Sequence, residues 1–490
     1  MDDIIKIEPN ELRTEMQKLR AEGYDFMRSL TGMDWGEEGL GVVYHLEKTA
    51  TGENKVIKAV TANREKAELP TVCDIWKGAE FNEREVYDYF GIRFVGHPDM
   101  RRLFLREDWI GHPLRKDYDE SLNPLRMTNE EPVDTTQYME VQHDGSVIEK
   151  RETIFDEDEY IINIGPQHPA THGVLRFRVS LEGEIIKKLD VHCGYIHRGI
   201  EKMCESLTYP QTLALTDRLD YLGAHQNRHA LCMCIEKAMG VEVSERVQYI
   251  RTIMDELQRI DSHLLFFSCL CMDLGALTAF FYGFRDREKI LDIFEATTGG
   301  RLIQNYNTIG GVQADIAPDF VQKVKDFIAY LRPTLKEYHE VFTGNVIAQQ
   351  RLKGTGVLTR EDAVSFGATG GTGRASGWAC DVRKRHPYAM YGKVDFREVL
   401  FTEGDCFARY MVRMEEILES LRIIEQLIDN IPEGDYAVKM KPIIKLPEGR
   451  YFRQVEASRG PLGIFIESHG DKNPYRLKIN SACLPLVRWP

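Results

Sequence analysis

The sequence lacks the features that mark several common classes of protein. It has ten cysteines but no CxxC pair, and its length and ordinary composition disfavour a disulfide framework. The 63 basic residues are outnumbered by 77 acidic ones, and the net charge of −14 argues against a generic nucleic-acid binder. The first residues, MDDIIKIEPN, show neither a basic region nor an apolar segment of a signal peptide. We therefore expect a reducing, cytoplasmic chain whose thiols are mostly small core residues.

Nucleotide-binding and zinc-binding patterns are also missing. The glycine-rich stretch GATGGTG lacks the Gly-Lys-Ser/Thr ending of a P-loop, and no clear strand precedes it. No GxGxxG follows a strand, so a dinucleotide site is not predicted. His225 and His229 lie four residues apart, but without a clear third ligand they do not indicate a structural zinc site.

One apolar run imitates a membrane span. Residues 264–284, LLFFSCLCMDLGALTAFFYGF, are long enough to cross a bilayer, but Asp273 lies near their middle. The preceding residues continue the same pattern in amphipathic form. The run therefore predicts a helix buried in a soluble bundle, in which the buried Asp273 needs a partner.

The order of sequence patterns predicts an α+β protein with two domains. Residues 1–118 alternate helical and strand-like segments, as a small α/β domain would. Residues 119–155 are polar, include two prolines and show no sustained period, which is typical of a linker. Residues 156–490 begin with a small β-sheet, continue with long helices to about residue 430 and end in strands. With 43% hydrophobic residues, the chain can bury a large core.

The loop GPQHPATHG between the first two strands of the second domain carries His168 and His172. A metal site, a catalytic loop and a plain turn all remain possible, and the spacing alone favours the turn. A histidine in a constrained loop and an acid in an apolar helix could also form a proton-handling pair, which gives the hypothesis that Asp273 orients His172.

Long motifs resemble one known family, the fused C/D subunit of respiratory complex I, the proton-pumping NADH:quinone oxidoreductase. The C-type signature is EREVYDYFGIRFVGHPDMRRLFLREDWIGHPLRKDY, residues 83–118. The D-type signatures are GPQHPATHGVLR, GYIHRGIEK, TDRLDYLGAHQNRHA, DLGALTAFFYGFRDREK and GDCFARYMVRMEEILESLRII. The resemblance extends over nearly the whole chain and includes the fused order of the two parts.

The resemblance implies a D part related to the large subunit of nickel–iron hydrogenases. Those enzymes hold their metal with two CxxC pairs; here Cys193 falls on the first cysteine position and Ile196 on the second, so no metal site is expected. In this family the vacated cavity receives a quinone headgroup. The resemblance assigns His172 and Tyr221 as its ligands and Asp273, as a buried carboxylate, as the partner of His172. His168 would shape the loop.

The resemblance further implies a peripheral subunit that works only inside a membrane complex. Its substrate would be a quinone, menaquinone or ubiquinone, and the chain itself would bind no iron–sulfur cluster, flavin or nickel. The expected partners are the iron–sulfur small subunit with the terminal cluster, other peripheral-arm subunits and an integral membrane subunit of the quinone channel. Arg198 would lie near that cluster and raise its potential. The place implied is the cytoplasmic face of the bacterial inner membrane, with electrons from NADH or ferredoxin.

Two departures from the family pattern stand out. Ile303 takes the place of a histidine that usually lies near the cluster, so we expect the cluster potential to depend weakly on pH. The chain ends at LPLVRWP, where family members continue through another helix, so the D part is expected to be short at its C-terminus. Two rival hypotheses are a metal-bearing hydrogenase subunit, which the missing CxxC disfavours, and a non-catalytic scaffold or assembly subunit.

Overall fold

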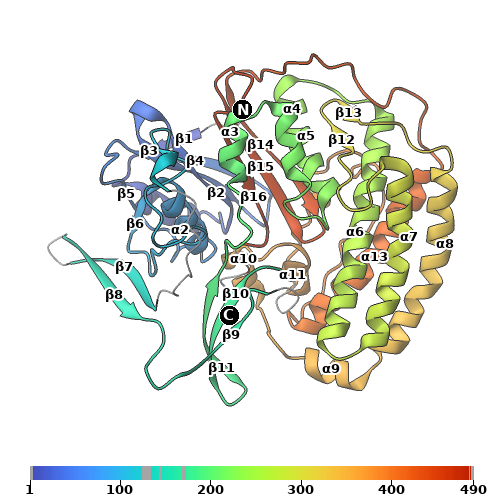
Figure 1. Ribbon diagram of the computed structural model, residues 1–490, viewed down its shortest axis with the longest axis horizontal. Helices are drawn as coiled ribbons and strands as arrows, with labels where there is room; N and C mark the ends of the chain where they lie inside the picture. Colours follow the sequence, from blue (N-terminus) through green and yellow to red (C-terminus); the bar gives the residue numbers. More distant parts are fainter. Residues whose placement is uncertain (1–3, 124–133, 143–145, 168–172, 485, 487–490) are drawn as a thin grey trace. The chain divides into compact units, whose positions relative to one another are not determined.

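The computed structural model describes residues 4–123, 134–142, 146–167, 173–484 and 486. These residues form two compact units (Figure 1). The first unit takes in residues 1–202, 364–368 and 483–490, and the second takes in residues 203–363 and 369–482. The predicted α+β class is confirmed. The division of the sequence at residues 118 and 156 stays a prediction, because the compact units follow contacts rather than sequence resemblance.

A four-stranded sheet in the order β1-β4-β3-β2 forms the centre of the first unit. Its strands are β1 (Ile4–Ile7), β2 (Phe26–Asp34), β3 (Leu40–Glu47) and β4 (Asn54–Thr61). Strand β1 pairs with β4 in parallel, and the other pairs are antiparallel. The helices α1 (Leu12–Ala21) and α2 (Ala79–Phe90) add Leu12, Met16 and Phe90 to a core shared with Leu30 and Tyr44. The alternation of helix and strand predicted for this region is confirmed.

Smaller sheets complete the first unit. They are β5 (Glu68–Pro70) with β6 (Arg93–Val95), the hairpin β7 (Thr135–Val141) with β8 (Val147–Thr153), and the antiparallel sheet of β9 (Tyr160–Ile164), β10 (Arg176–Glu182) and β11 (Ile185–His192). The polar stretch interpreted as a linker thus contains a hairpin. Its side chains are mostly exposed, but Met139 is buried and its carbonyl accepts a hydrogen bond from the Gly96 amide at 3.2 Å. Polarity indicated exposure here but could not reveal backbone pairing.

The second unit is rich in helices, and Figure 1 shows α6, α7, α8 and α13 running alongside one another. The helices towards its start are α3 (Ile200–Ser206), α4 (Tyr209–Thr216), α5 (Ala224–Met239), α6 (Glu245–Asp273), α7 (Leu277–Thr298) and α8 (Phe320–Tyr338). Then come α9 (Val346–Leu352), α11 (Gly370–Ala375), α12 (Val382–Arg385) and α13 (Cys406–Ile428), whereas α10 (Arg360–Phe366) has residues in both units. The strands are β12 (Asn307–Thr308), β13 (Gly311–Val312), β14 (Gly449–Ala457), β15 (Gly460–Ser468) and β16 (Arg476–Asn480).

The apolar run at residues 264–284 is not the single helix that was predicted. Helix α6 ends at Asp273, Gly275 takes a left-handed conformation with φ +82°, and α7 begins at Leu277. Glycine adopts this conformation without the steric cost of a Cβ, so the chain can turn back between the two helices. None of the helices in the described ranges has the length and apolar character needed to cross a bilayer.

Candidate functional site

The structure describes three of the five residues that the sequence assigns to the site. His168 and His172 lie outside the described residues. Tyr221 lies between α4 and α5 and Asp273 at the end of α6, both in the second unit, whereas Arg198 belongs to the first unit. The contact predicted between His172 and Asp273 therefore stays a prediction.

Tyr221 stands on a short loop, residues 217–223, that is fixed at its start by a buried ion pair. Asp217 directly follows α4, and its carboxylate accepts hydrogen bonds from Arg228 at 3.1 Å and from the Asn305 amide at 3.1 Å. Burial raises the pKa of Asp217 to about 6, although the positive charge of Arg228 opposes this. Arg228 also donates to the Leu213 carbonyl and to the Asn305 side chain, so the loop begins from a rigid base.

The end of the same loop is fixed around Asp220. Its carboxylate accepts a hydrogen bond from the Leu222 amide at 3.1 Å. Its carbonyl accepts from the Gly223 amide at 2.9 Å and from the Asn227 side chain at 3.0 Å. Between these anchored residues the side chain of Tyr221 is 49% exposed. Among the described residues none hydrogen-bonds its phenol, so the hydroxyl is available to a ligand.

Asp273 is exposed, and the expectation of a buried carboxylate is wrong for this chain by itself. The reason is the turn after α6. The Ala276 amide donates to the Cys271 carbonyl at 2.7 Å, which closes the turn and leaves Asp273 at the tip of a helical hairpin rather than inside one apolar helix.

Arg198 belongs to an exposed loop that His197 ties to the first unit. The Gly199 amide donates to Nδ1 of His197 at 3.2 Å, so Nε2 carries the proton and meets the Tyr89 hydroxyl at 2.6 Å. Gly194 takes φ +107°, and a Cβ there would lie 2.3 Å from the Phe104 carbonyl oxygen. The loop therefore depends on a glycine at this point, and Arg198 is exposed on it.

Cys193, which the resemblance places at a hydrogenase cysteine position, acts as a half-buried hydrogen-bond donor. Its Sγ lies 3.6 Å from the Leu103 carbonyl oxygen. Burial raises the pKa of the Cys193 thiol to about 11, so the group stays protonated near neutral pH.

One group of residues in the described chain has the composition of a metal site: Cys73, Glu83 and His97. Nδ1 of His97 accepts from the Asp99 amide at 2.9 Å, so its Nε2 is protonated and donates to the Glu80 carbonyl at 3.0 Å. The carboxyl of Glu83 accepts from Thr71 and from the Val72 amide. Both imidazole nitrogens and both carboxyl oxygens are thus engaged in hydrogen bonds within the protein.

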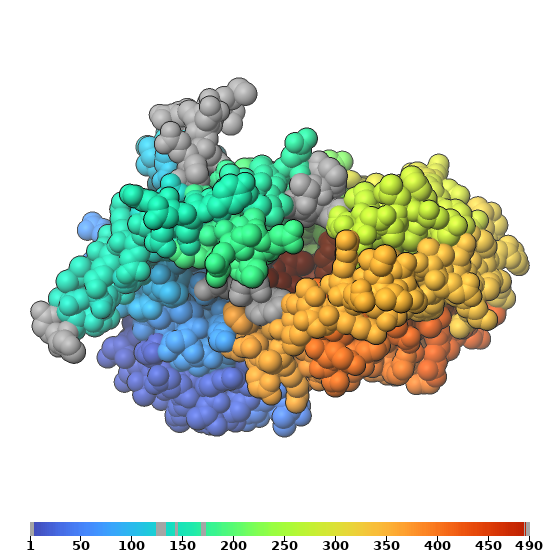
Figure 2. All heavy atoms as spheres, turned by 90° about the horizontal axis from the view of Figure 1, so that it is seen from below, coloured from blue at the N-terminus to red at the C-terminus, as the bar shows by residue number. Residues whose placement is uncertain are grey.

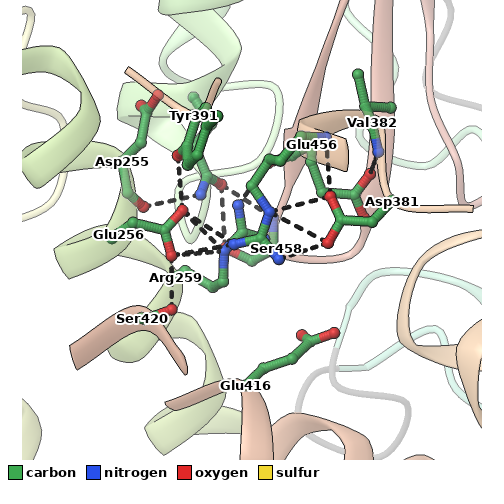
Figure 3. Close-up of polar contacts among 12 residues, drawn as sticks. Asp255, Glu256, Arg259, Asp381, Val382, Tyr391, Glu416, Ser420, Glu456 and Ser458 are labelled. Atoms are coloured by element: carbon green, nitrogen blue, oxygen red, sulfur yellow. Dashed lines mark hydrogen bonds and ion pairs between the residues drawn. The ribbon is translucent and has the colours of Figure 1, made fainter. Parts of the chain in front are cut away.

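Sequence reasoning missed a buried ionic cluster in the second unit, drawn in Figure 3. Glu256 of α6 is its first centre. The Glu256 carboxylate accepts hydrogen bonds from Arg259 at 3.2 Å and from Arg383 at 3.1 Å. It also accepts from the hydroxyls of Tyr391 and Ser420, both at 2.6 Å. Burial raises the pKa of Glu256, but the two guanidinium groups outweigh it and hold the pKa below its usual range.

Glu456 of β14 is the second centre. Arg374 donates to Glu456 at 2.7 Å and to Glu416 at 2.8 Å, and His263 meets the other oxygen of Glu416 at 2.8 Å. Burial raises the pKa of Glu456 to about 7 and lowers the pKa of His263 to about 4. The ionic cluster so defined comprises Glu256, Arg259, His263, Arg374, Asp381, Arg383, Glu416 and Glu456, all buried.

The two histidines of α5 share a buried acid. Asp255 accepts from Nδ1 of His225 at 2.8 Å and from Nδ1 of His229 at 2.7 Å. Burial raises the pKa of Asp255, but the two imidazoles hold it well below its usual range. Nε2 of His225 is buried with no partner among the described residues. The pair that did not fit a zinc site is therefore a polar anchor between α5 and α6.

Comparison with protein families matches two segments of the chain. Residues 5–123 match the family described as respiratory-chain NADH dehydrogenase, 30 Kd subunit. Residues 273–445 and 438–488 match the respiratory-chain NADH dehydrogenase, 49 Kd subunit. The second part also belongs to the superfamily of hydrogenase large subunits.

Whole-chain relatives agree. The C/D subunit of the NADH-quinone oxidoreductase of Phocaeicola vulgatus is 85% identical over 99% of this chain and 94% of its own length, and that of Bacteroides fragilis is 72% identical with the same coverage. A chain in the membrane-bound sulfane sulfur reductase, an archaeal respiratory membrane complex, is 35% identical, with a TM-score of 0.65 over 68% of this chain and 90% of its own. The chain therefore belongs to the family of fused C/D subunits of NADH-quinone oxidoreductase.

Proposed function

We propose that this chain forms the quinone-reduction site of a proton-pumping NADH (or ferredoxin):quinone oxidoreductase and is active only within that complex. The observation that carries the proposal is the braced loop that presents the Tyr221 phenol, 49% exposed, in a chain of this family. A fixed donor with no partner among the described side chains is what an incoming carbonyl oxygen requires.

The chemistry explains the choice of side chains. Reduction of a quinone to a quinol adds two electrons and two protons, one proton to each oxygen. The phenol of Tyr221 and the imidazole of His172 can each hydrogen-bond one quinone oxygen and give it a proton as negative charge develops. Asp273, exposed in the chain alone, would then become covered on assembly and stabilise the imidazolium of His172.

The electrons are proposed to come from the terminal iron–sulfur cluster of a neighbouring small subunit. Arg198 supports this role because its guanidinium is exposed on a loop that His197 and Gly194 hold in place. A fixed cation beside a cluster favours its reduced state and so raises its potential.

The tip of the α6–α7 hairpin supports a partner surface next to Asp273. Arg351 of α9 donates to the Leu274 carbonyl at 3.4 Å, which ties α9 to this tip. In Figure 2 the yellow-green surface, the colour of the α6–α7 region, adjoins the orange surface, the colour of the region around α9. Large apolar side chains are exposed on both: Leu277, Phe281, Val346 and Ile347.

Such a surface fits burial against another subunit. We propose an integral membrane subunit of the quinone channel as that partner, with this chain lying peripherally at the cytoplasmic face of the bacterial inner membrane and with other peripheral-arm subunits around it.

The test replaces Tyr221 by phenylalanine in the assembled complex. Tyr221→Phe removes only the hydroxyl, and loss of one hydrogen bond to a developing charge costs about a hundredfold or more in rate. Quinone reductase activity should fall by that order, whereas reduction of an artificial acceptor that takes electrons upstream should be unchanged.

Tyr436→Phe is the matched control, because Tyr436 is a similarly exposed tyrosine, at 41%, in the same unit. It should leave both activities unchanged. Equal loss of both activities in Tyr221→Phe would indicate misassembly, and unchanged quinone reduction would remove Tyr221 from the site.

A further inference from the structure

The loop that carries Tyr221 makes one more contact, to a turn more than 200 residues away in sequence. A guanidinium nitrogen of Arg459 donates to the carboxylate oxygen of Asp220 that the Leu222 amide does not use. Asp220 directly precedes Tyr221. One carboxylate therefore joins the backbone that follows Tyr221 to a side chain from the turn between β14 and β15.

The turn that carries Arg459 is itself fixed by close packing. Gly370 at the start of α11 packs so tightly that a Cβ there would lie 2.2 Å from the Arg459 carbonyl oxygen. The amide and the hydroxyl of Ser458 donate to Gln226 at 2.9 and 3.0 Å, and Gln226 donates to the Asp255 carbonyl at 2.9 Å. The guanidinium thus projects from a base that α5, α6 and α11 hold.

The exposure of this ion pair indicates a local role in holding the loop rather than a role in the stability of the whole unit. The side chains of Arg459 and Asp220 are 43% and 31% exposed. Pairs this open to water contribute little to the stability of a whole domain. What the pair does contribute is a link between the loop of Tyr221 and a rigid turn.

We propose that Arg459 is a positioning residue for quinone reduction, which acts through Asp220 to hold Tyr221 in the orientation that meets the quinone oxygen. The inference rests on the proposed function and goes beyond it, because it assigns a role to a residue of the β14–β15 turn. Small misplacements of a reacting group are costly in rate, so the link matters for turnover even where it matters little for folding.

A double-mutant cycle in the assembled complex tests the proposal. Arg459→Gln and Asp220→Asn each remove one charge, and the new side chain of Asp220→Asn keeps a carbonyl oxygen that can accept from the Leu222 amide. We expect each single variant to lower the kcat of quinone reduction by about tenfold, with reduction of the artificial acceptor unchanged. The double variant should be no slower than either single one, because both act through the same contact. Arg459→Lys should recover part of the activity, since it keeps the charge but not the planar fork.

Arg450→Gln is the matched control. Arg450 pairs with Glu467 at 2.6 Å at the other end of β14, and its replacement should not change quinone reduction. Additive losses in the double variant would show that Arg459 acts on its own and would overturn the proposal. So would unchanged quinone reduction in Arg459→Gln while Tyr221→Phe is impaired, an outcome that leaves the proposed function standing. If Arg459→Gln were slow and Tyr221→Phe normal, both the proposed role of Tyr221 and this inference would fall.

Discussion

Single residues in this chain owe their roles to partners that are distant in sequence. His225 and His229 formed a visible pair, but the residue that explains them, Asp255, lies on the next long helix. A carboxylate that accepts from two imidazoles gives three buried polar groups a hydrogen-bond partner at once. This costs less free energy than burying any of them without a partner. Asp255 is therefore expected to matter for stability and for its dependence on pH.

Asp255→Asn should lower the free energy of unfolding at pH 7 by about 1–3 kcal/mol, because one imidazole N–H would then face an amide donor instead of an acceptor. The pKa of Asp255 is lower in the folded chain than its unfolded value of about 4. Its ionised form thus stabilises the fold above pH 4, and this contribution is lost as the pH falls below that value.

Urea unfolding of the chain between pH 7 and pH 3 measures both effects. The variant should lose stability less steeply than the wild type below about pH 4. The exposed Asp326→Asn serves as control and should behave as the wild type. Parallel curves for Asp255→Asn and wild type would contradict the assignment.

Helix α6 shows at the scale of elements what a periodic pattern can and cannot predict. The apolar stripe of this helix, which includes Val247, Ile250 and Met254, is fully buried. Its polar face is buried as well, with Glu256 and Arg259 inside the ionic cluster. An amphipathic pattern assigns a charged face to water, and only packing against β14 and α13 places it in the interior.

Some other elements could also be predicted from local sequence patterns, and others could not. Periodicity and turn residues were enough to predict the strands from Tyr160 to His192 and the C-terminal strands. The turn at Gly275 was hidden by the apolar residues around it, so Asp273 was assigned to a helix interior. The site residues came from long motifs. The contact of Arg459 with the loop of Tyr221 could not be predicted, because it joins segments more than 200 residues apart in sequence.

The ionic cluster of α6, α11, α12, α13 and β14 gives a prediction for Glu456→Gln. Burial raises the pKa of Glu456 to about 7, so the neutral carboxyl is favoured in the folded chain. The stability that the neutral carboxyl contributes is complete below about pH 4, the unfolded pKa, and is lost as the pH rises through 7. Glutamine mimics the neutral acid and cannot ionise. The free energy of unfolding of Glu456→Gln should therefore lack this decline, which in the wild type amounts to up to about 1.4 kcal/mol per pH unit.

Unfolding free energies of wild type and Glu456→Gln at pH 5, 6, 7 and 8 provide the measurement. As the pH rises, the free energy of unfolding of the variant should increase relative to that of the wild type. A constant gap over this range would mean that Glu456 is ionised throughout, and the account of the cluster would need a different proton-binding group.

At the scale of the whole molecule, the family and the exposed tip of the α6–α7 hairpin both indicate that the chain works as a subunit of a larger assembly. We predict that native purification from membranes brings down an iron–sulfur subunit and integral membrane subunits together with this chain. The purified chain alone should not reduce quinone with NADH, because the proposed electron path begins on other subunits. Quinone reduction by the isolated chain would show that the proposal of a subunit active only in the complex is wrong.

The central claim, that the loop around Tyr221 meets the quinone, can be tested most directly by photolabelling. A photoactivatable quinone analogue is bound to the assembled complex, irradiated, and the labelled peptides are mapped with and without an excess of unmodified quinone. The account predicts label on the segment from Asp217 to Gly223 that the excess quinone suppresses. Label confined to other subunits, or label on this segment that excess quinone does not reduce, would contradict it.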